Sequence, residues 1–493
     1  MIDIKKVFKQ TVKFNVVSII SALIQIPTQI IIGVFLLPEE FGIISLISLW
    51  SLYSGLINPG MLSAGQREIP YLIGKKNIEQ SLKVQNVSIS SDLIYSILPF
   101  LVIICSSYFY SNKIIKIGLI ITAFYFIINK LPTYWSSINF ANQKFSVVAS
   151  GRLIGVICSP IIIICFIYLL GIYAVLMAPL ISAIITGVYY LIKGPINYSF
   201  KLEWKEIIRL IRIGFVFSLS GVIFYGYKMA DSTIIASFLP LNDLGLFSFA
   251  MALIMFGINF LADFGRVLEP IIWEHFGKVD NEEESFENIK NIIIYTAIFT
   301  AMLIPFAQIG YGVVVKLIVP KYLLSFPLFI ILSSMLYLAM MPTIPNIILN
   351  SVIVNKQKYV TLVYALGLSI NIILNILAIK VGYGIKTIAF ITIGSQGLIT
   401  IILFILSSKY ILNKIDNIKI FVFYTIFPFI IFVMFSFSHY YLNNIILNNW
   451  YFVCISLFLQ IIVWGIVILI IYKEYFPKKE IIFELKNIIN RNQ

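Results

Sequence analysis

The sequence predicts an all-α polytopic membrane protein with about fourteen transmembrane helices, and three observations support that prediction. Hydrophobic residues make up 60% of the 493-residue chain and charged residues 12%, with a mean hydropathy of +0.97. Soluble domains carry about a quarter of charged residues, so the bilayer is the expected solvent. The other two observations are the spacing of the apolar runs and the distribution of lysine and arginine between alternate loops.

Fourteen apolar runs are long enough to cross a bilayer, which takes about 20 apolar residues in a helix. They lie near residues 14–36, 41–62, 86–109, 114–139, 147–169, 172–193, 210–238, 244–272, 291–315, 324–350, 360–380, 385–407, 419–438 and 450–472. They divide the chain into five parts: a six-helix bundle over 1–193, a cytoplasmic linker over 194–209, a second six-helix bundle over 210–407, two additional transmembrane helices over 408–472 and a cytoplasmic tail over 473–493.

The lysine and arginine residues test this arrangement. With the N-terminus inside, 27 of the 36 fall in inner segments and 6 in outer loops. Positively charged short loops stay on the cytoplasmic side, so we expect a multi-pass protein of the inner (cytoplasmic) membrane with both termini in the cytoplasm. The net charge of +14 then reflects topology and attraction to anionic membrane lipids, with no nucleic-acid role. Residues 64–83 are expected to form a helix on the inner membrane surface.

Two sequence echoes indicate that the two bundles are related. A shift of 203 positions aligns four residues with identical ones: Gly42 with Gly245, Ser45 with Ser248, Gly74 with Gly277 and Lys75 with Lys278. A second echo, at a different offset, sets Gln-Lys-Phe at 143–145 against Gln-Lys-Tyr at 357–359. Internal repeats in a strongly apolar chain are typical of secondary transporters, in which two related bundles rock about a site between them.

The chain carries no motif of enzyme chemistry. It lacks the G-x-S-x-G and H-E-x-x-H patterns, a glycine-rich phosphate loop and a Walker lysine. Its four cysteines have no C-x-x-C spacing, and its two histidines are far apart. We therefore expect no catalytic residue, metal site or cofactor. A polymerase or ligase of lipid-linked glycans would need a large charged outer loop, whereas the longest outer loop, near 439–449, carries no acid, lysine or arginine.

Ionisable and amide side chains within the spans are the candidate functional residues. A charge at the bilayer centre costs roughly 2.5–3.5 kcal/mol on insertion scales, so it normally faces a cavity or a partner. Lys130 has no acidic residue within one turn and is the first choice for contacting an anionic substrate. Lys228 and Asp231, three residues apart, can pair on one face, either to permit insertion or to line a cavity. Asn371 and Asn375, four apart, face one way.

Three arginines are further candidates. Arg152 enters the fifth span from an inner loop, and it either points into the cavity or marks the inner boundary. Arg266 shares a face with Asp263 and Glu269 near the inner end of its helix, where charged side chains can extend into water. Arg67 lies in the expected surface helix.

Four short features occur in order over residues 5–410: the segment Leu37-Pro38-Glu39-Glu40-Phe41-Gly42, the segment Asn58-Pro59-Gly60 followed by Arg67, the turn Asn142-Gln143-Lys144-Phe145, and an aspartate in the seventh span. With the fourteen spans, the 6+6+2 layout and the cationic interior, they resemble the Wzx-type polysaccharide-export flippases. These flippases belong to the multidrug/oligosaccharidyl-lipid/polysaccharide (MOP) superfamily.

The resemblance implies two six-helix bundles in a V around a central cavity, with two C-terminal helices added. It also implies that undecaprenyl-pyrophosphate-linked oligosaccharide repeat units move from the inner to the outer leaflet by alternating access, for surface polysaccharide (O-antigen, capsule or exopolysaccharide) assembly. The diphosphate needs cationic partners. The candidates are Lys130, Lys228, Arg67, Arg152 and Arg266. A proton or sodium gradient would bias the cycle, with Asp231 as the candidate coupling carboxylate.

The implied partners are the lipid-linked oligosaccharide, membrane lipids, and the polysaccharide polymerase and chain-length machinery. Two alternatives within the same superfamily stay open. A lipid II flippase differs only in its substrate. A drug/cation antiporter would favour acidic cavity residues and twelve spans, so the fourteen spans and the cationic bias argue against it.

Overall fold

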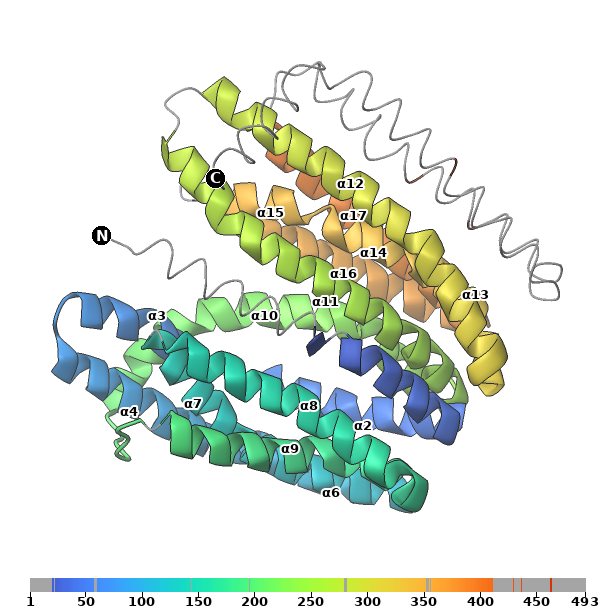
Figure 1. Ribbon diagram of the computed structural model, residues 1–493, viewed down its shortest axis with the longest axis horizontal. Helices are drawn as coiled ribbons and strands as arrows, with labels where there is room; N and C mark the ends of the chain where they lie inside the picture. Colours follow the sequence, from blue (N-terminus) through green and yellow to red (C-terminus); the bar gives the residue numbers. More distant parts are fainter. Residues whose placement is uncertain are drawn as a thin grey trace, which may run out of the picture.

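The computed structural model of the protein describes residues 20–410, with gaps at 22, 57–59, 143, 195, 279–281, 352–353 and 355, and the single positions 429, 436 and 462. Within those residues every regular element is a helix. The helices form two lobes arranged as a V, with α10 between them (Figure 1). The predicted all-α fold is confirmed, whereas the spans predicted at 419–438 and 450–472 and the tail lie outside the described residues.

The helices follow the predicted spans closely. The N-lobe contains the helix Leu23–Phe35 and the elements α2 (Pro38–Leu56), α3 (Met61–Gly74), α4 (Ile78–Tyr95), α5 (Ile97–Ser107), α6 (Lys113–Ile128), α7 (Lys130–Ala141), α8 (Phe145–Leu170) and α9 (Ile172–Lys193). Next comes α10 (Trp204–Phe238). The C-lobe contains α11 (Leu241–Lys278), α12 (Glu282–Val313), η1 (Val314–Ile318), η2 (Pro320–Ser325), α13 (Phe326–Leu332), α14 (Ser334–Met340), α15 (Thr343–Asn350), α16 (Gln357–Lys380) and α17 (Ile385–Ser408). In the described part, nine helical segments can cross a membrane, or ten if α2 and α3 count as one bent span.

Three predicted spans are built from more than one helix because local groups interrupt the backbone hydrogen bonds. Between α4 and α5, the hydroxyl of Ser96 donates to the carbonyl oxygen of Asp92 (2.6 Å). Pro132 near the start of α7 has no backbone N–H to donate, and Pro342 and Pro345 have the same effect around α15. Of these breaks, the one at Pro132 lies in the lining of the larger N-lobe pocket described below.

The prediction of a surface helix over residues 64–83 is wrong. Ile69 of α3 is buried in a core cluster with side chains of α4, α7 and α10, and the helix ends at Gly74. Lys76 adopts a left-handed conformation (φ 61°) in the turn, and Asn77 caps α4 by accepting a backbone N–H. Lysines spaced among apolar residues are typical of a membrane-surface helix, but here they mark a turn between two packed helices.

The lobes meet at one end of the V, where α2 and α11 bring their backbones into contact. A Cβ atom on Gly42 would lie 1.9 Å from the carbonyl oxygen of Leu241, and one on Gly245 would lie 1.7 Å from that of Pro38. Such distances leave no room for any side chain, so both positions require glycine. The contact is reciprocal under the 203-residue shift, which relates Pro38 to Leu241 and Gly42 to Gly245. The repeat in the sequence therefore corresponds to a two-fold-related helix pair.

Further contacts hold this end of the V closed. The hydroxyl of Tyr322 donates to the carbonyl oxygen of Leu36 (3.1 Å), and the Lys321 ammonium donates to that of Val34 (2.9 Å). One apolar core cluster contains buried side chains of both lobes at this end. In Figure 1 the lobes diverge from this closed end toward α3 and the start of α12.

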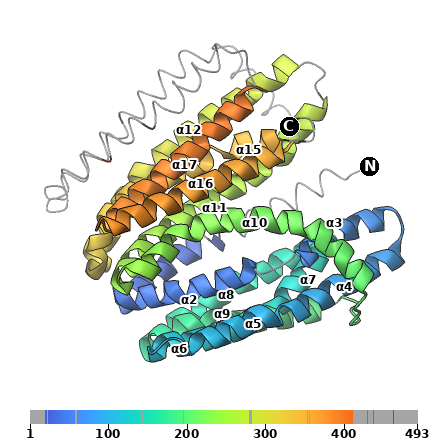
Figure 2. The same ribbon diagram turned by 180° about the vertical axis from the view of Figure 1, so that it is seen from behind.

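The long helix α10 packs on both lobes (Figure 2). It begins at Trp204, so the last part of the predicted linker (194–209) is helical. Leu210 belongs to the N-lobe cluster with α3, α4 and α7, and a Cβ on Gly214 would lie 2.2 Å from the carbonyl oxygen of Gly60. Farther along, Tyr227 is buried among side chains of α16 and α17. The first half of α10 therefore belongs to the N-lobe and its second half to the C-lobe.

Candidate functional site

The N-lobe contains two adjoining pockets. The larger, ≈ 680 Å³, is lined by α6, α7, α8 and α9 with one residue of α3. The smaller, ≈ 400 Å³, lies between the helix Leu23–Phe35 and α8. Both volumes fall within the range of roughly 300–1,000 Å³ typical of ligand sites. Arg152, Gly155 and Ser159 line both pockets, so the pockets adjoin along α8, which in Figure 1 runs between α9 and the opening of the V.

Arg152 is the charged residue of this pocket pair. Its side chain is exposed, and it lies two turns from the start of α8 at Phe145. No aspartate, glutamate or lysine lines either pocket among the described residues. Of the two predicted roles for Arg152, the geometry favours the one in which it points into a cavity. A planar guanidinium suits a phosphate, because its N–H groups can donate in pairs to two phosphate oxygens.

Glycines on α8 allow α9 to approach closely and leave hydroxyl groups at the pocket wall. A Cβ on Gly151 would lie 2.3 Å from the ring of Tyr190, and one on Gly155 would lie 3.4 Å from Thr186 Oγ1. Ser182 donates its hydroxyl to the carbonyl oxygen of Gly155 (3.0 Å). Thr186 is buried, and its Oγ1 has no hydrogen-bond partner. A buried hydroxyl without a partner is costly, so this atom is available to a ligand.

Lys130 lines neither pocket, and although no acidic residue lies within one turn of it, it has an acidic partner on another helix. Its ammonium lies 3.1 Å from the carboxylate of Asp92 on α4, and only 15% of its side chain is exposed. The Tyr134 hydroxyl donates to the same carboxylate (2.6 Å), and the ammonium lies 5.0 Å from the centre of the Phe126 ring. Asp92 stands 38 positions away in the chain, so a comparison within one helix turn could not find it. The pair joins α4 to α7.

Asp231 lies at the junction of α10, α16 and α17 in the C-lobe, where it is buried. Its Oδ1 accepts hydrogen bonds from the amides of Asn371 (3.1 Å) and Asn375 (2.9 Å), and its Oδ2 accepts one from the Thr392 hydroxyl (2.7 Å). The four-residue spacing does place the two asparagines on one face, as predicted. Every hydrogen bond described for this carboxylate comes from a neutral group, so its charge is solvated by dipoles alone.

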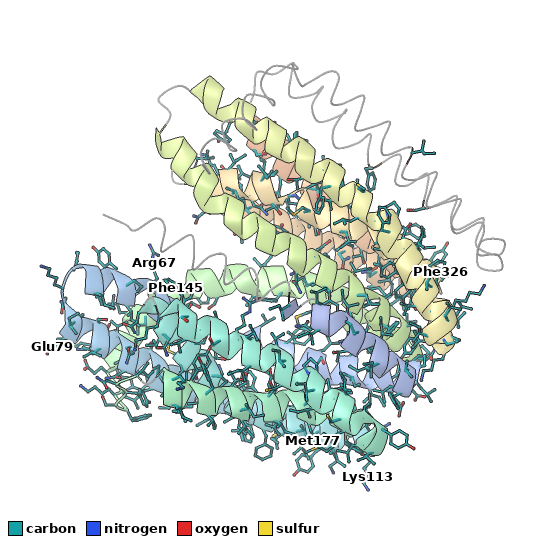
Figure 3. The ribbon with its side chains drawn as sticks, viewed as in Figure 1. Arg67, Glu79, Lys113, Phe145, Met177 and Phe326 are labelled. Atoms are coloured by element: carbon teal, nitrogen blue, oxygen red, sulfur yellow. The ribbon has the colours of Figure 1, made fainter. Side chains whose placement is uncertain are left out.

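Of the other predicted cations, Lys228 and Arg67 line neither pocket. Lys228 has an exposed side chain, whereas Asp231 is buried, so their predicted pairing does not supply the hydrogen bonds of Asp231. Arg67 lies on α3 at the open end of the V, at the opposite end of the N-lobe from Lys113 (Figure 3). Arg266 lies within α11, but its side chain is outside the described residues. Of the described candidates, Arg152 therefore remains the one at the pockets.

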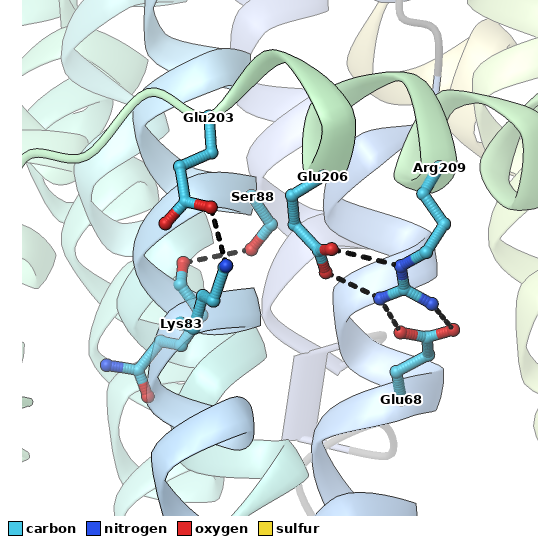
Figure 4. Close-up of polar contacts among 7 residues, drawn as sticks. Glu68, Lys83, Ser88, Glu203, Glu206 and Arg209 are labelled. Carbon is cyan, nitrogen blue, oxygen red and sulfur yellow. Dashed lines mark hydrogen bonds and ion pairs between the residues drawn. The ribbon is translucent and has the colours of Figure 1, made fainter.

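A charged network joins α10 to the N-lobe, and no sequence pattern indicated it (Figure 4). The guanidinium of Arg209 donates from Nη1 to Glu68 on α3 (2.7 Å) and from Nη2 to Glu206 (2.6 Å). Lys83 of α4 pairs with Glu203 just before α10 (2.5 Å). The hydrogen bonds to Glu68 and then to Glu206 raise the pKa of Arg209, so the arginine stays charged. The network fixes the start of α10 to α3 and α4.

A comparison with known protein families identifies the family of this chain. The family described as "Polysaccharide biosynthesis protein" matches residues 31–327, which is more than half of the chain. The chain belongs to this family. A comparison with curated proteins finds no match.

This polysaccharide biosynthesis protein shares its fold with solved transporters of the MOP superfamily. The lipid II flippase MurJ, in an inward closed conformation, aligns with a TM-score of 0.71 and 16% identity over 94% of this chain and 99% of that one. An inward-facing multidrug resistance MATE transporter aligns at 0.61 and 14%, over 80% and 98%. A Pyrococcus furiosus MOP transporter, described by a binding pocket of reverse polarity, aligns at 0.55 and 14%, over 82% and 95%. The predicted fold is confirmed, because these transporters share it over most of the chain.

Proposed function

We propose that this protein is a flippase that moves undecaprenyl-pyrophosphate-linked oligosaccharide repeat units from the inner to the outer leaflet of the cytoplasmic membrane, for surface polysaccharide assembly. The N-lobe pocket pair is the observation that carries the proposal, because its described lining combines polar side chains with Arg152 and no carboxylate. Membership in the polysaccharide biosynthesis family supports a glycan substrate. The shared fold with a lipid II flippase supports a lipid-linked one.

Each part of such a substrate has a matching environment. The diphosphate suits the guanidinium of Arg152, and the sugar hydroxyls suit the hydroxyl and amide lining. The prenyl chain is apolar and stays in the bilayer, so it needs no enclosed pocket. Leu23 on the first helix and Ile161 on α8 are exposed apolar side chains on the two helices that flank the smaller pocket, and they suit contact with the chain.

The distribution of charge orients the molecule. The positive-inside bias places the open end of the V, where Arg67 lies, on the cytoplasmic side, and Lys113 at the outer side. The conformation is then open inward, so the substrate enters from the inner leaflet. Opening outward requires α2 and α11 to separate at the contact between Gly42 and Gly245. Two rigid lobes that rock about such a contact give alternating access.

The Asp231 cluster is the proposed coupling site, which a sodium ion or a proton neutralises once per cycle. Small hard cations favour oxygen ligands, and this cluster offers a carboxylate, the Thr392 hydroxyl and two amides. The amide oxygen of Asn375 is buried without a hydrogen-bond partner, and rotation of the amide turns it toward the carboxylate side.

Two alternatives within the superfamily are distinguished by their substrates. A drug/cation antiporter would bind cationic compounds, and the described pocket lining offers them an arginine and no carboxylate. A lipid II flippase would bind the same diphosphate and prenyl chain, so the charge of the pocket does not distinguish it from the proposed flippase. The family match favours the polysaccharide substrate.

Deletion and complementation in the native host test the proposal. Cells that lack the protein should accumulate lipid-linked oligosaccharide that stays protected from glycan-modifying enzymes added outside spheroplasts, and they should lose surface polysaccharide. Re-expression of the wild type restores both. Arg152→Gln should restore at least tenfold less polysaccharide, with Arg152→Lys in between because an ammonium donates to phosphate as a point charge. Accumulation of lipid II would favour the alternative substrate, and unchanged surface polysaccharide would refute the proposal.

A further inference from the structure

We propose that the larger N-lobe pocket is a carbohydrate subsite that holds the sugar attached to the diphosphate, so that the protein selects its substrate at the reducing-end sugar. The inference rests on the proposed flippase function and goes beyond it, because a flippase could bind the diphosphate and leave the whole glycan in open water. The composition of the pocket, its unsatisfied hydroxyl and its position beside Arg152 together support a sugar-binding role.

Ten of the eighteen residues that line the pocket carry groups that both donate and accept hydrogen bonds. Its hydroxyl and amide residues are Gln66, Tyr125, Asn129, Thr133, Ser136, Ser137, Ser159, Ser182, Thr186 and Tyr190. A sugar ring presents hydroxyls in several directions, and it needs partners of this kind on several sides at once. An apolar ligand would leave the buried Thr186 Oγ1 unpaired, which costs about 1–3 kcal/mol. The lining therefore favours a polyhydroxylated ligand.

One buried group in this wall has no hydrogen-bond partner within the described part of the protein. Thr186 is 8% exposed, and its Oγ1 has no hydrogen-bond partner although it lines the pocket. Its neighbour Ser182 already donates to the carbonyl oxygen of Gly155. The absence of a side chain at Gly155 leaves space in front of Thr186, since a Cβ there would lie 3.4 Å from Oγ1. A sugar hydroxyl that enters this space satisfies the threonine.

An aromatic ring borders the same pocket. Phe140 is 49% exposed and lines the pocket near the end of α7, where it packs edge-on against Phe145 with ring centres 5.1 Å apart. The negative face of an aromatic ring attracts the polarised C–H groups on one side of a pyranose. Hydroxyl partners on α9 and an aromatic face on α7 can thus contact different edges of one ring.

The position of Arg152 sets which sugar of the glycan enters. This residue lines both pockets, so a diphosphate held by its guanidinium places the attached sugar in the larger one. A volume of ≈ 680 Å³ suits a drug-sized ligand, so the end of the glycan fits and the remainder extends outside. The described lining carries a cation and no carboxylate, so neutral or acidic sugars fit and a sugar with a free ammonium group is disfavoured.

Binding of three synthetic probes to the purified full-length protein tests this inference. The probes are farnesyl diphosphate, farnesyl diphosphate linked to N-acetylglucosamine, and the same conjugate with unacetylated glucosamine. We expect the N-acetylated sugar to raise affinity about tenfold over farnesyl diphosphate alone, and glucosamine to remove that gain. Thr186→Val should abolish the gain but leave the affinity for farnesyl diphosphate unchanged. Thr122→Val is the matched control, because Thr122 is also 8% exposed but lies on α6 outside the pocket lining.

The outcomes separate this inference from the proposed function. Phe140→Ala provides a second variant, at a half-exposed position, and it should also lower the gain from the sugar. If the wild type binds farnesyl diphosphate but the sugar adds nothing, the subsite inference fails and the flippase proposal stands. A gain that survives in both Thr186→Val and Phe140→Ala overturns the inference in the same way. If the wild type binds none of the three probes, both proposals fail.

Discussion

The candidate sites of the two lobes carry opposite charges. In the N-lobe, the first helix and α8 line the smaller pocket, α6 to α9 line most of the larger one, and Arg152 lies at both. In the C-lobe, α10, α16 and α17 meet at Asp231, whose asparagine and threonine partners are all buried. Thr28, which stands 203 positions before Asp231, lines the smaller N-lobe pocket. The N-lobe position that the repeat aligns with Asp231 therefore lies at a pocket, whereas Asp231 itself lies in a packed helix junction.

This difference teaches how a duplicated fold can divide two tasks. An anionic substrate and a coupling cation would neutralise each other's binding groups if they shared one cavity. On the proposed function, Arg152 in one lobe and Asp231 in the other act on the same rocking motion without direct contact. We propose that the charge at each site, more than the fold itself, decides what is transported and what drives it.

The largest effect is expected from Lys130→Met, which tests whether the buried N-lobe ion pair is separate from the pocket. The change leaves the Asp92 carboxylate, 1% exposed, without its cation, and breaking a buried pair costs about 3–5 kcal/mol. We expect a strongly lowered thermal-unfolding temperature in detergent. Lys130, which the sequence suggested as the first choice for an anionic substrate, is thus expected to act on stability.

The double variant Lys130→Met/Asp92→Asn is the control for that prediction. It should recover most of the lost stability, because an asparagine is neutral and still accepts the hydrogen bond from Tyr134. The prediction fails if Lys130→Met protein unfolds at the wild-type temperature but no longer binds farnesyl diphosphate. That result would show that Lys130 contacts the substrate.

A smaller effect is expected from Gly245→Ala, which tests the two-fold contact between the lobes. The new methyl group would overlap the Pro38 carbonyl, and such overpacking typically costs about 1–3 kcal/mol. In a background without native cysteines, cross-linking between Pro38→Cys and Leu241→Cys should fall several-fold. Gly310→Ala on α12 is the control, since a Cβ there meets no atom within 4 Å. Equal cross-linking in both variants would show that the lobes do not close on these glycines.

The smallest effect is expected from Arg209→Gln, which tests whether the first half of α10 belongs to the N-lobe. The arginine side chain is 40% exposed, so solvent screens the pair and we expect a loss of about 1 kcal/mol or less. The loss should shrink as salt concentration rises. Lys83→Gln breaks the more exposed pair with Glu203 and should cost less. A larger loss of stability from Lys83→Gln would show that the segment before α10, at Glu203, holds the helix to the N-lobe.

The sequence could predict features that depend on local spacing or on repetition. Asn371 and Asn375 stand four apart, and helix geometry alone places both beside one partner. Gly42 and Gly245 were aligned by the repeat, and they meet because a two-fold axis brings equivalent positions together. The long apolar runs predicted the helices, since backbone N–H and C=O groups in a bilayer must find hydrogen bonds within the protein, and a helix provides them.

Contacts between distant helices could not be predicted from the same information. Lys130 was assigned to the substrate because its partner Asp92 lies on a different span, 38 positions away. Glu68 and Arg209 are 141 positions apart, and nothing in either neighbourhood indicates the other. Such pairings depend on which helices pack together, and that is decided by side-chain shapes over the whole lobe.

The separation of charges between the lobes is tested most directly by the thermal unfolding of two variants with two ligands. Farnesyl diphosphate and sodium chloride, the latter compared with choline chloride, should each raise the unfolding temperature of the wild type, because a ligand that binds the folded state stabilises it. We predict that Arg152→Gln loses the response to farnesyl diphosphate and keeps that to sodium, and that Asp231→Asn shows the reverse pattern. Loss of both responses in one variant, or of neither response in both, would contradict the account.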